Sequence, residues 1–130
     1  MYMKKVLFVE DDPFLIDIYG TKLKQAGYEI AVQSDGEKVV ASILKEKPDV
    51  VVLDIVLPHV DGWDILRSIQ ENEEAKRTKI IILSNLGQKD EVEKGLQLGA
   101  ARYLIKAHYT PSQVVGEITK VLEQYYTRHE

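Results

Sequence analysis

The chain alternates short apolar runs with longer amphipathic stretches from one end to the other. Within the runs, apolar and mostly β-branched residues follow one another without polar residues between them. Such continuous runs are typical of parallel strands that are covered on both faces. Strands that alternate with helices predict an α/β fold with a parallel sheet and right-handed crossovers. Five strands are expected, at residues 6–9, 30–32, 50–53, 80–83 and 103–105.

Helix start and stop signals lie between the predicted strands. Asp12 followed by Pro13 is typical of an N-cap with proline at the first helical position. Residues 110–113, Thr-Pro-Ser-Gln, combine the same proline placement with a capping box. Further helices are expected to begin at Ser34 with Glu37 and at Asp61, and to run from about Lys89 to Leu98 before Gly99.

The composition predicts one globular domain of ordinary size. The chain has 130 residues, 45% hydrophobic and 29% charged, and no linker or repeat divides it, so we expect a single domain over 1–130. The absence of cysteine excludes disulfides and thiolate chemistry and suits the cytoplasm, where we expect the protein to act. No segment reads as a signal peptide or membrane span, and the net charge of −4 argues against nucleic acid as a direct partner.

The ends of the predicted strands carry the candidate chemistry. Acidic residues 10–12 follow the first strand, Asp54 the third, Ser84 the fourth and Lys106 the fifth. Because the carboxyl ends of parallel strands open on one edge of the sheet, we expect these side chains to meet there. Gathered carboxylates repel one another, and Mg²⁺, or Mn²⁺, would relieve this repulsion while keeping coordination places for phosphate. Asp12 is expected to cap its helix rather than to bind the metal.

The same groups indicate phosphoryl chemistry. A hydroxyl and an ammonium group beside the carboxylates can hold phosphoryl oxygens through charge-assisted hydrogen bonds. A carboxylate can itself attack phosphorus and form an aspartyl phosphate. Asp54 follows the apolar run 50–53, where an aspartate can also simply cap a turn. The combination with Ser84 and Lys106 favours Asp54 as a phosphoryl acceptor.

With these residues the chain is similar to the receiver domains of bacterial response regulators over essentially its whole length, and resembles single-domain regulators of the chemotaxis type. The family pattern is an acidic pair after the first strand, an aspartate after the third, a Leu-Pro-x-x-Asp-Gly loop, Ser or Thr after the fourth strand and Lys after the fifth. Residues 57–62 match the loop, and Gly99-Ala100 matches the turn before the last strand. The resemblance implies a flavodoxin-like, doubly wound, five-stranded parallel sheet with strand order 2-1-3-4-5 and five helices.

The resemblance also assigns a role to each site residue. Asp54 would be the phosphoacceptor, Ser84 would hydrogen-bond the phosphoryl group, and Lys106 would pair with it. Ser84 and Tyr103 would form the switch, in which the aromatic ring follows the hydroxyl after phosphorylation. Mg²⁺ would be held by Asp11, Asp54, the backbone carbonyl of Val56 and, through water, Glu10.

Two positions depart from the family pattern. Asn85 stands where the family usually has Ala, and its bulkier side chain could narrow phosphodonor access or add a hydrogen bond. Ala107 stands where the family usually has a Pro that is often joined to Lys106 by a cis bond. Without proline a cis bond costs about 2.5–4 kcal/mol, so either this bond is trans or tertiary contacts hold the strain. The rim of the site is expected to consist of Val56, Asn85 and Leu86.

Three functions are compatible with this reading. In the first, the chain is a receiver that accepts a phosphoryl group on Asp54 from a histidine kinase or phosphotransfer protein and then changes its affinity for a downstream protein. The second is an aspartate-nucleophile phosphatase or phosphotransferase. Such enzymes commonly place a second Asp two residues after the nucleophile, where this chain has Val56, so we expect no enzyme beyond slow self-dephosphorylation. The third is an interaction module that does not use phosphate, and the complete set of site residues argues against it.

The sequence also predicts the state of association. Receivers joined to winged-helix DNA-binding domains usually form a dimer through two acids after the Gly-Ala turn and an Arg in the last helix. This chain has Ala101-Arg102 and, at the matching helical position, Gly116. We therefore expect the unphosphorylated protein to be mainly monomeric, although Tyr109 could support a different dimer.

Overall fold

Five parallel strands form the central sheet of the computed structural model, which describes residues 3–129. Their order across the sheet is β2-β1-β3-β4-β5, as the family resemblance implied. The order reverses at β1, which pairs with β2 on one side and with β3 on the other. The strands are β1 (Lys5–Val9), β2 (Glu29–Gln33), β3 (Val50–Leu53), β4 (Lys79–Ser84) and β5 (Arg102–Ile105).

Four of the five strands are slightly longer than the predicted apolar runs, and β3 coincides with its run. Lys5, Glu29, Lys79 and Arg102 each belong to the start of a strand although their side chains are charged. Ladder hydrogen bonds join backbone groups, so pairing continues past the last apolar side chain wherever the neighbouring strand also continues. The same effect makes Ser84 the last residue of β4 rather than the first residue after it.

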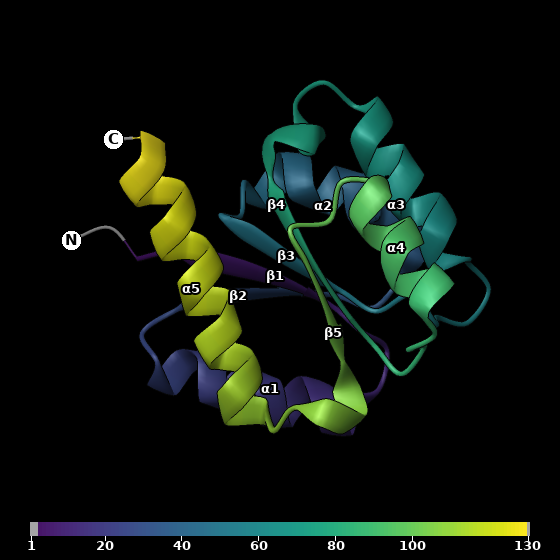
Figure 1. Ribbon diagram of the computed structural model, residues 1–130. Coiled ribbons are helices and arrows are strands. Elements are labelled where there is room, and N and C mark those ends of the chain that lie inside the picture. Colours follow the sequence, from purple (N-terminus) through teal and green to yellow (C-terminus); the bar gives the residue numbers. More distant parts are fainter. Residues whose placement is uncertain (1–2, 130) are drawn as a thin grey trace.

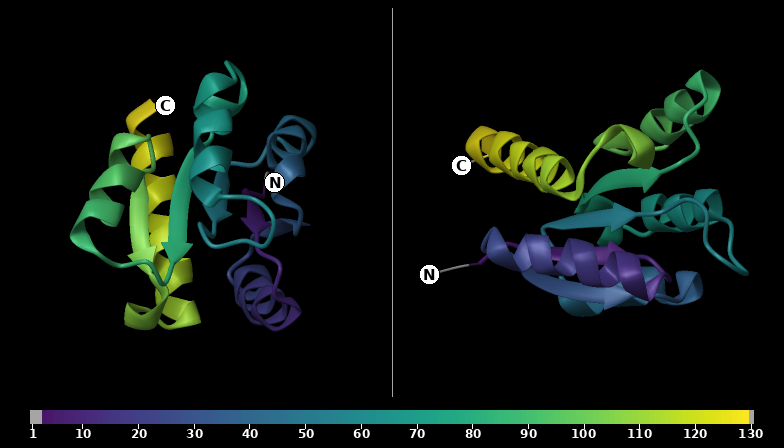
Figure 2. Two further views of the ribbon diagram at one scale, coloured as in Figure 1. Left: turned by 90° about the vertical axis from the view of Figure 1, so that its right-hand side faces the viewer. Right: turned by 90° about the horizontal axis from the view of Figure 1, so that it is seen from below.

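Five α-helices connect and cover the strands, with α1 and α5 on one face of the sheet and α2, α3 and α4 on the other (Figures 1 and 2). None of the helices within residues 3–129 has the length and apolar character needed to cross a membrane. The α-helices are α1 (Pro13–Gln25), α2 (Val39–Glu46), α3 (Gly62–Glu71), α4 (Lys89–Gln97) and α5 (Pro111–His129), and the 3₁₀ helices are η1 (Gly36–Lys38), η2 (Ala75–Arg77) and η3 (Lys106–His108).

Each strand buries side chains on both faces, which explains the continuous apolar runs. In β1, Val6 and Phe8 pack toward α1 and α5, whereas Leu7 and Val9 pack toward α2 and α3. All four of these side chains are buried. Successive side chains of a strand point to opposite faces, so a strand covered by helices on both sides needs apolar residues at every position.

Three of the predicted helix starts are confirmed by side-chain caps. The Asp12 carboxylate accepts from the backbone N–H of Phe14 at 2.9 Å, and Asp61 caps α3 in the same way. At α5, Thr110 and Gln113 bond to each other's backbone N–H groups at 2.8 and 3.2 Å, as in a capping box. These caps are local in sequence, and for this reason the sequence alone could predict them.

The helix start predicted at Ser34 with Glu37 is wrong. Asp35 instead caps the short helix η1, its carboxylate accepting from the backbone N–H of Glu37 at 3.0 Å. The regular helix α2 begins only at Val39. Asp is as good an N-cap as Ser, and Asp35 is the residue whose backbone is extended at the point where the chain turns.

Candidate functional site

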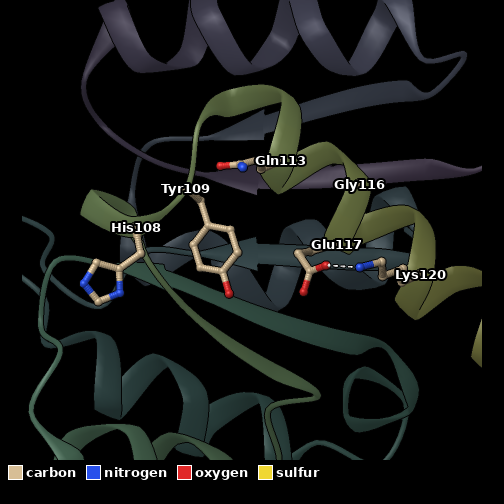
Figure 3. Close-up of a pocket in the computed structure, with 6 residues that line it drawn as sticks. All are labelled: His108, Tyr109, Gln113, Gly116, Glu117 and Lys120. Atoms are coloured by element: carbon tan, nitrogen blue, oxygen red, sulfur yellow. Dashed lines mark ion pairs between the residues drawn. The ribbon is translucent and has the colours of Figure 1, made fainter.

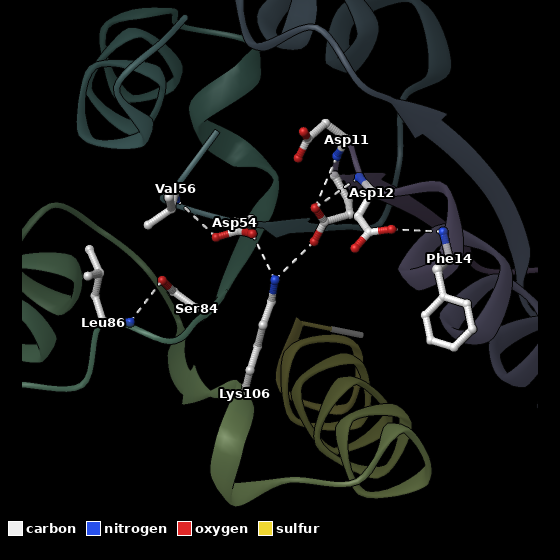
Figure 4. A network of polar contacts seen from close by, with 9 residues as sticks. Asp11, Asp12, Phe14, Asp54, Val56, Ser84, Leu86 and Lys106 are labelled. Carbon is white, nitrogen blue, oxygen red and sulfur yellow. Dashed lines mark hydrogen bonds and ion pairs between the residues drawn. The ribbon is translucent and has the colours of Figure 1, made fainter. Parts of the chain in front are cut away.

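The predicted site residues meet at the carboxyl edge of the sheet, where Lys106 joins two carboxylates (Figure 4). Its Nζ atom lies 2.8 Å from Oδ2 of Asp54 and 3.0 Å from Oε1 of Glu10. The two acids follow neighbouring strands β1 and β3, and Lys106 follows β5. The side chains of Lys106, Asp54 and Glu10 are 16%, 9% and 3% exposed, so these ion pairs are largely shielded from solvent.

Glu10 is the most buried acid of the site. Its Oε2 atom accepts from the backbone N–H groups of Asp11 and Asp12, at 3.1 and 3.3 Å. Burial raises the pKa of Glu10 above its ordinary value, and the hydrogen bond and charge of Lys106 oppose this shift. Lys106 and, more weakly, the backbone N–H of Asp12 therefore favour the charged form of Glu10 and lower its pKa against the effect of burial.

For Lys106, burial and the neighbouring charges act on the pKa in the opposite directions from those at Glu10. Burial alone would lower its pKa, but the hydrogen bonds and charges of Asp54 and Glu10 outweigh this and raise the pKa above the ordinary value. The lysine therefore stays protonated near neutral pH. A positive charge held beside Asp54 is suited to pair with an incoming phosphoryl group.

The loop after β3 fixes the carboxylate of Asp54. Its Oδ1 atom accepts from the backbone N–H of Val56 at 3.0 Å, while Oδ2 faces Lys106. The loop then folds back so closely that a Cβ at Gly62 would lie 2.3 Å from the carbonyl oxygen of Ile55. Only glycine fits at this position. The Leu-Pro-x-x-Asp-Gly motif thus has a steric cause that bears directly on the position of Asp54.

Ser84 is fully buried at the end of β4, one strand away from Asp54. Its hydroxyl oxygen accepts from the backbone N–H of Leu86 at 3.2 Å. The Tyr103 hydroxyl donates to the carbonyl oxygen of the same Leu86. Burial raises the pKa of Tyr103, and its contact with the Ser84 hydroxyl opposes that shift. The two predicted switch residues are therefore linked both by this contact and through the backbone of Leu86.

The remaining acids of the site are placed differently from one another. Asp12 caps α1, as expected, whereas the side chain of Asp11 is exposed at the rim (Figure 4). Among the side chains that the structure describes, no group of three or more His, Cys, Asp or Glu is arranged to hold a metal. The expected Mg²⁺ set needs only two carboxylates in direct contact, because a backbone carbonyl and water complete it. Glu10 and Asp54, which share one lysine, and the exposed Asp11 together supply hard oxygen donors and excess negative charge, which fits a small divalent cation.

The peptide bond after Lys106 is trans, as are the other bonds of residues 3–129. Of the two possibilities that Ala107 left open, the structure has the unstrained one. Residues 106–108 form the 3₁₀ helix η3, which directs the chain away from the sheet toward α5. The predicted rim residues differ in exposure: Val56 and Asn85 are exposed, and Leu86 is half-buried.

Residues 6–118 match the protein family described as response regulator receiver domain. The chain belongs to this family. It is therefore the receiver domain of a two-component response regulator, and the flavodoxin-like fold with strand order 2-1-3-4-5 agrees with this assignment.

Relatives and solved structures support the same family. The chain is 35% identical to the probable transcriptional regulator ycf27 of Guillardia theta over 93% of its own length and 46% of that protein. It is 33% identical to the DNA-binding dual master transcriptional regulator RpaA of Synechocystis, covering 80% of this chain and 43% of that one. The signal receiver domain of a LuxO repressor protein from Vibrio parahaemolyticus matches with a TM-score of 0.88 and 26% identity, covering 98% and 96% of the two chains. The chain spans about half the length of the curated relatives it matches.

Sequence reasoning missed one feature of this site and one cap of the helix that follows it. The bridge from Leu86 to both Ser84 and Tyr103 uses backbone atoms, so no side-chain pattern could reveal it. The side chain of Glu91, the third residue of α4, accepts a hydrogen bond from the backbone N–H of Gln88 at 3.3 Å and so caps the start of that helix. The Gln-x-x-Glu spacing was a signal for this second feature, since it resembles a capping box.

Proposed function

We propose that Asp54 accepts a phosphoryl group from the phosphohistidine of a histidine kinase or phosphotransfer protein, and that the aspartyl phosphate changes the affinity of the domain for a downstream protein. The observation that carries this proposal is the contact between Lys106 and Asp54, 2.8 Å apart and largely shielded, with the buried Ser84 hydroxyl one strand away. Family membership supports this class of reaction, and the contacts support Asp54, Lys106 and Ser84 as the residues that perform it.

The chain's own groups account for each part of the transfer. One carboxylate oxygen of Asp54 attacks phosphorus, and the bond from phosphorus to the histidine nitrogen breaks. The phosphohistidine ring carries a proton on its other nitrogen, so it leaves as neutral imidazole while Asp54 becomes an acyl phosphate. Lys106 and the Ser84 hydroxyl hold the phosphoryl oxygens, which carry more charge after the transfer than the carboxylate did before it. Lys106 must then shift its ion pair from Asp54 to the new group while Glu10 holds its other side.

The proposed cation site uses Asp11, Asp54 and the backbone carbonyl of Val56, with Glu10 acting through water. Bound Mg²⁺ (or Mn²⁺) would neutralise the charge that gathers between the carboxylates and the phosphoryl oxygens. The exposed position of Asp11 at the rim leaves this carboxylate accessible to a metal that enters from solvent. The backbone N–H of Val56 already bonds Asp54, so the segment that offers the carbonyl is held in place.

The domain acts in this proposal as a switch and not as a turnover enzyme. Val56 is 59% exposed and apolar, and it stands where aspartate-nucleophile phosphatases carry a second Asp as general acid or base. Ser84 and Tyr103 carry the response, because a dianion at Asp54 draws the Ser84 hydroxyl toward it and the Tyr103 ring follows this hydroxyl. The altered surface is the face of α4, β5 and α5.

The proposed partners are proteins. Residues 1–130 act as one receiver domain in the cytoplasm, and its direct partners are the phosphodonor and a downstream protein rather than nucleic acid or a membrane. The net charge of −4 supports this for the domain itself. Two of the relatives named above are transcriptional regulators about twice as long as this chain. In such relatives, we expect DNA to be bound by the parts of the protein that lie outside the matched domain.

Binding of a phosphoryl mimic tests the proposed function. We expect Mg²⁺ with beryllofluoride to shift the backbone amide resonances near Asp54, Ser84, Tyr103 and Lys106, because these groups surround the proposed acceptor. Mg²⁺ alone should shift a smaller set around Asp11. If beryllofluoride causes no shift, or the same shifts without Mg²⁺, the proposed acceptor site is wrong.

The rim residues predict slow loss of the phosphoryl group. Hydrolysis needs a water aligned opposite the leaving carboxylate, and neither the exposed Val56 nor the half-buried Leu86 can hydrogen-bond such a water. We expect Val56→Asn and Leu86→Glu to speed hydrolysis by at least about tenfold, since a positioned polar group orients the attacking water. The measurement is the decay of phosphorylated protein after removal of the donor.

An apolar control separates polarity from shape in that experiment. Val56→Leu should decay as slowly as the wild type, because it changes the size of the rim and not its hydrogen bonding. Equal decay in the wild type and in Val56→Asn would contradict the rim argument.

The unphosphorylated protein is predicted to be monomeric. The Arg102 side chain donates a hydrogen bond to the side-chain oxygen of Gln124 in α5 of the same chain, at 2.8 Å. Gly116 lines a surface pocket together with His108 and Tyr109 (Figure 3). The charged groups of the winged-helix type of dimer are therefore absent, because Ala101-Arg102 replaces the two acids and Gly116 replaces the arginine of the last helix. Light scattering coupled to gel filtration should give the mass of one chain. A dimer built on this face with the ion pairs of the winged-helix type would contradict the prediction.

A further inference from the structure

The ring of Tyr103 packs against α4 at a buried glycine. A Cβ at Gly95 would lie 2.8 Å from Cδ2 and 3.2 Å from Cε2 of the Tyr103 ring, and 2.7 Å from Cδ1 of Ile82. Contacts below 3.0 Å require something to move. Helix α4 can therefore approach β4 and β5 this closely, with Tyr103 between them, only because position 95 has no side chain.

The two neighbours of Gly95 differ in their freedom to move. Ile82 is fully buried in the core between the sheet and the helices, where close packing opposes a shift of its Cδ1 atom. Tyr103 is half-buried, and rotation about χ1 would carry its ring toward solvent. We therefore expect a methyl group at position 95 to displace the tyrosine ring and not the isoleucine.

The orientation of this ring affects Ser84. In its packed position the Tyr103 hydroxyl donates to the carbonyl oxygen of Leu86, and the N–H of Leu86 donates to the Ser84 hydroxyl at 3.2 Å. The loop between β4 and α4 is thus held at Leu86 through both its backbone N–H and its carbonyl group. Displacement of the ring removes one of these bonds and frees the loop beside Ser84.

We infer that Gly95 is a positioning residue. Because it has no side chain, it leaves the space in which the Tyr103 ring packs in the unphosphorylated protein. Through the hydrogen bonds of Leu86, this packing favours the position of the Ser84 hydroxyl that receives the phosphoryl group. The part that concerns phosphate rests on the function proposed above. The part that concerns the ring rests only on the contacts of Gly95 and can be tested without any phosphoryl group.

A second helix glycine provides a matched control. Gly116 lies within α5, and a Cβ there would meet no atom within 4 Å. Alanine is the better helix former, so Gly116→Ala should raise the midpoint of thermal unfolding. Gly95→Ala gains the same helix preference but must move the Tyr103 ring, so it should give no such rise. Circular dichroism of both variants also establishes that they fold.

The first measurement is made by NMR on the protein without phosphate or its mimics. The wild type and Gly116→Ala should show nuclear Overhauser contacts between the Tyr103 ring and the Ile82 side chain, which pair across β4 and β5. Gly95→Ala should lose them, and its Leu86 carbonyl resonance should move in the same direction as in Tyr103→Phe, which lacks the donating hydroxyl. Retention of the ring contacts in Gly95→Ala would overturn the inference.

The second measurement is the affinity for beryllofluoride with Mg²⁺. Gly95→Ala should bind about fivefold more weakly than the wild type, the factor that one ordinary hydrogen bond supplies. In a Tyr103→Ala background the ring is absent, so adding Gly95→Ala should change the affinity no further. An equal loss in both backgrounds, or no loss in either, would overturn the link to Ser84. Failure of the proposed function would appear differently, because the wild type itself would not bind the mimic.

Discussion

Asp54→Asn is expected to abolish covalent phosphorylation of the protein. An amide has no anionic oxygen with which to attack phosphorus, yet it has nearly the same shape as the carboxylate and can still accept from the backbone N–H of Val56. The fold should therefore remain intact while the chemistry is lost. The measurement is the fraction of protein that gains a phosphoryl group from acetyl phosphate and Mg²⁺, followed by intact-protein mass spectrometry.

Asp12→Asn is the matched control for this experiment. Asp12 belongs to the same edge of the sheet, and its structural task is to accept from the backbone N–H of Phe14, which asparagine can also do. We expect this variant to be phosphorylated as readily as the wild type. Uptake by Asp54→Asn at the wild-type level would show that another residue is the acceptor, and uptake lost equally in both variants would show that the loss is not specific to Asp54.

Lys106→Met is expected to lower the free energy of unfolding by about 3 kcal/mol at pH 7, without Mg²⁺. The change leaves Glu10 and Asp54, which are 3% and 9% exposed, facing each other without the ammonium group that joins them. Removing one partner of a buried ion pair costs about 3–5 kcal/mol, and the remaining exposure of Lys106 favours the lower end. Urea denaturation followed by circular dichroism measures the difference.

The loss of stability should depend on pH in a defined direction. Burial already raises the pKa of Glu10, and Lys106 is the main group that opposes this, so the variant should raise the pKa further. A carboxyl group whose pKa is higher in the folded state binds protons more tightly there than in the unfolded state. Its stabilising contribution is complete below the unfolded pKa and disappears as the pH rises through the folded pKa. The variant should therefore approach wild-type stability as the pH falls toward about 4.5, the ordinary value for Glu.

An exposed lysine serves as the control for the lysine substitution. Lys120 pairs with Glu117 at 3.0 Å on the surface of α5, and its side chain is 66% exposed. Solvent screens such a pair, so Lys120→Met should cost less than about 1 kcal/mol and show no recovery at acid pH. Similar losses in the two variants would contradict the view that Lys106 neutralises a shielded pair of carboxylates.

The sequence predicted most of the fold because the relevant signals are local. Continuous β-branched runs report burial on both faces of a strand, and residues such as Asp12 and Asp61 bond backbone groups two positions away. The one wrong helix start illustrates the limit of such signals. Ser34 and Asp35 are adjacent and both suited to an N-cap, and only the path of the chain into η1 selects Asp35.

The sequence by itself determined which side chains gather at the edge of the sheet, because parallel strands place the residues that follow them on the same side. Only the tertiary structure decided how these residues pair. Lys106 bridges Glu10, 96 positions away, and Asp54, 52 positions away, and Gly95 leaves room for the ring of Tyr103. Strand periodicity determines the side of the sheet on which a residue lies. Contacts over such separations depend instead on how closely α4 and β5 pack and on the rotamers that fit between them. They also depend on burial, which removes water from the charged groups and makes an ion pair their best remaining partner.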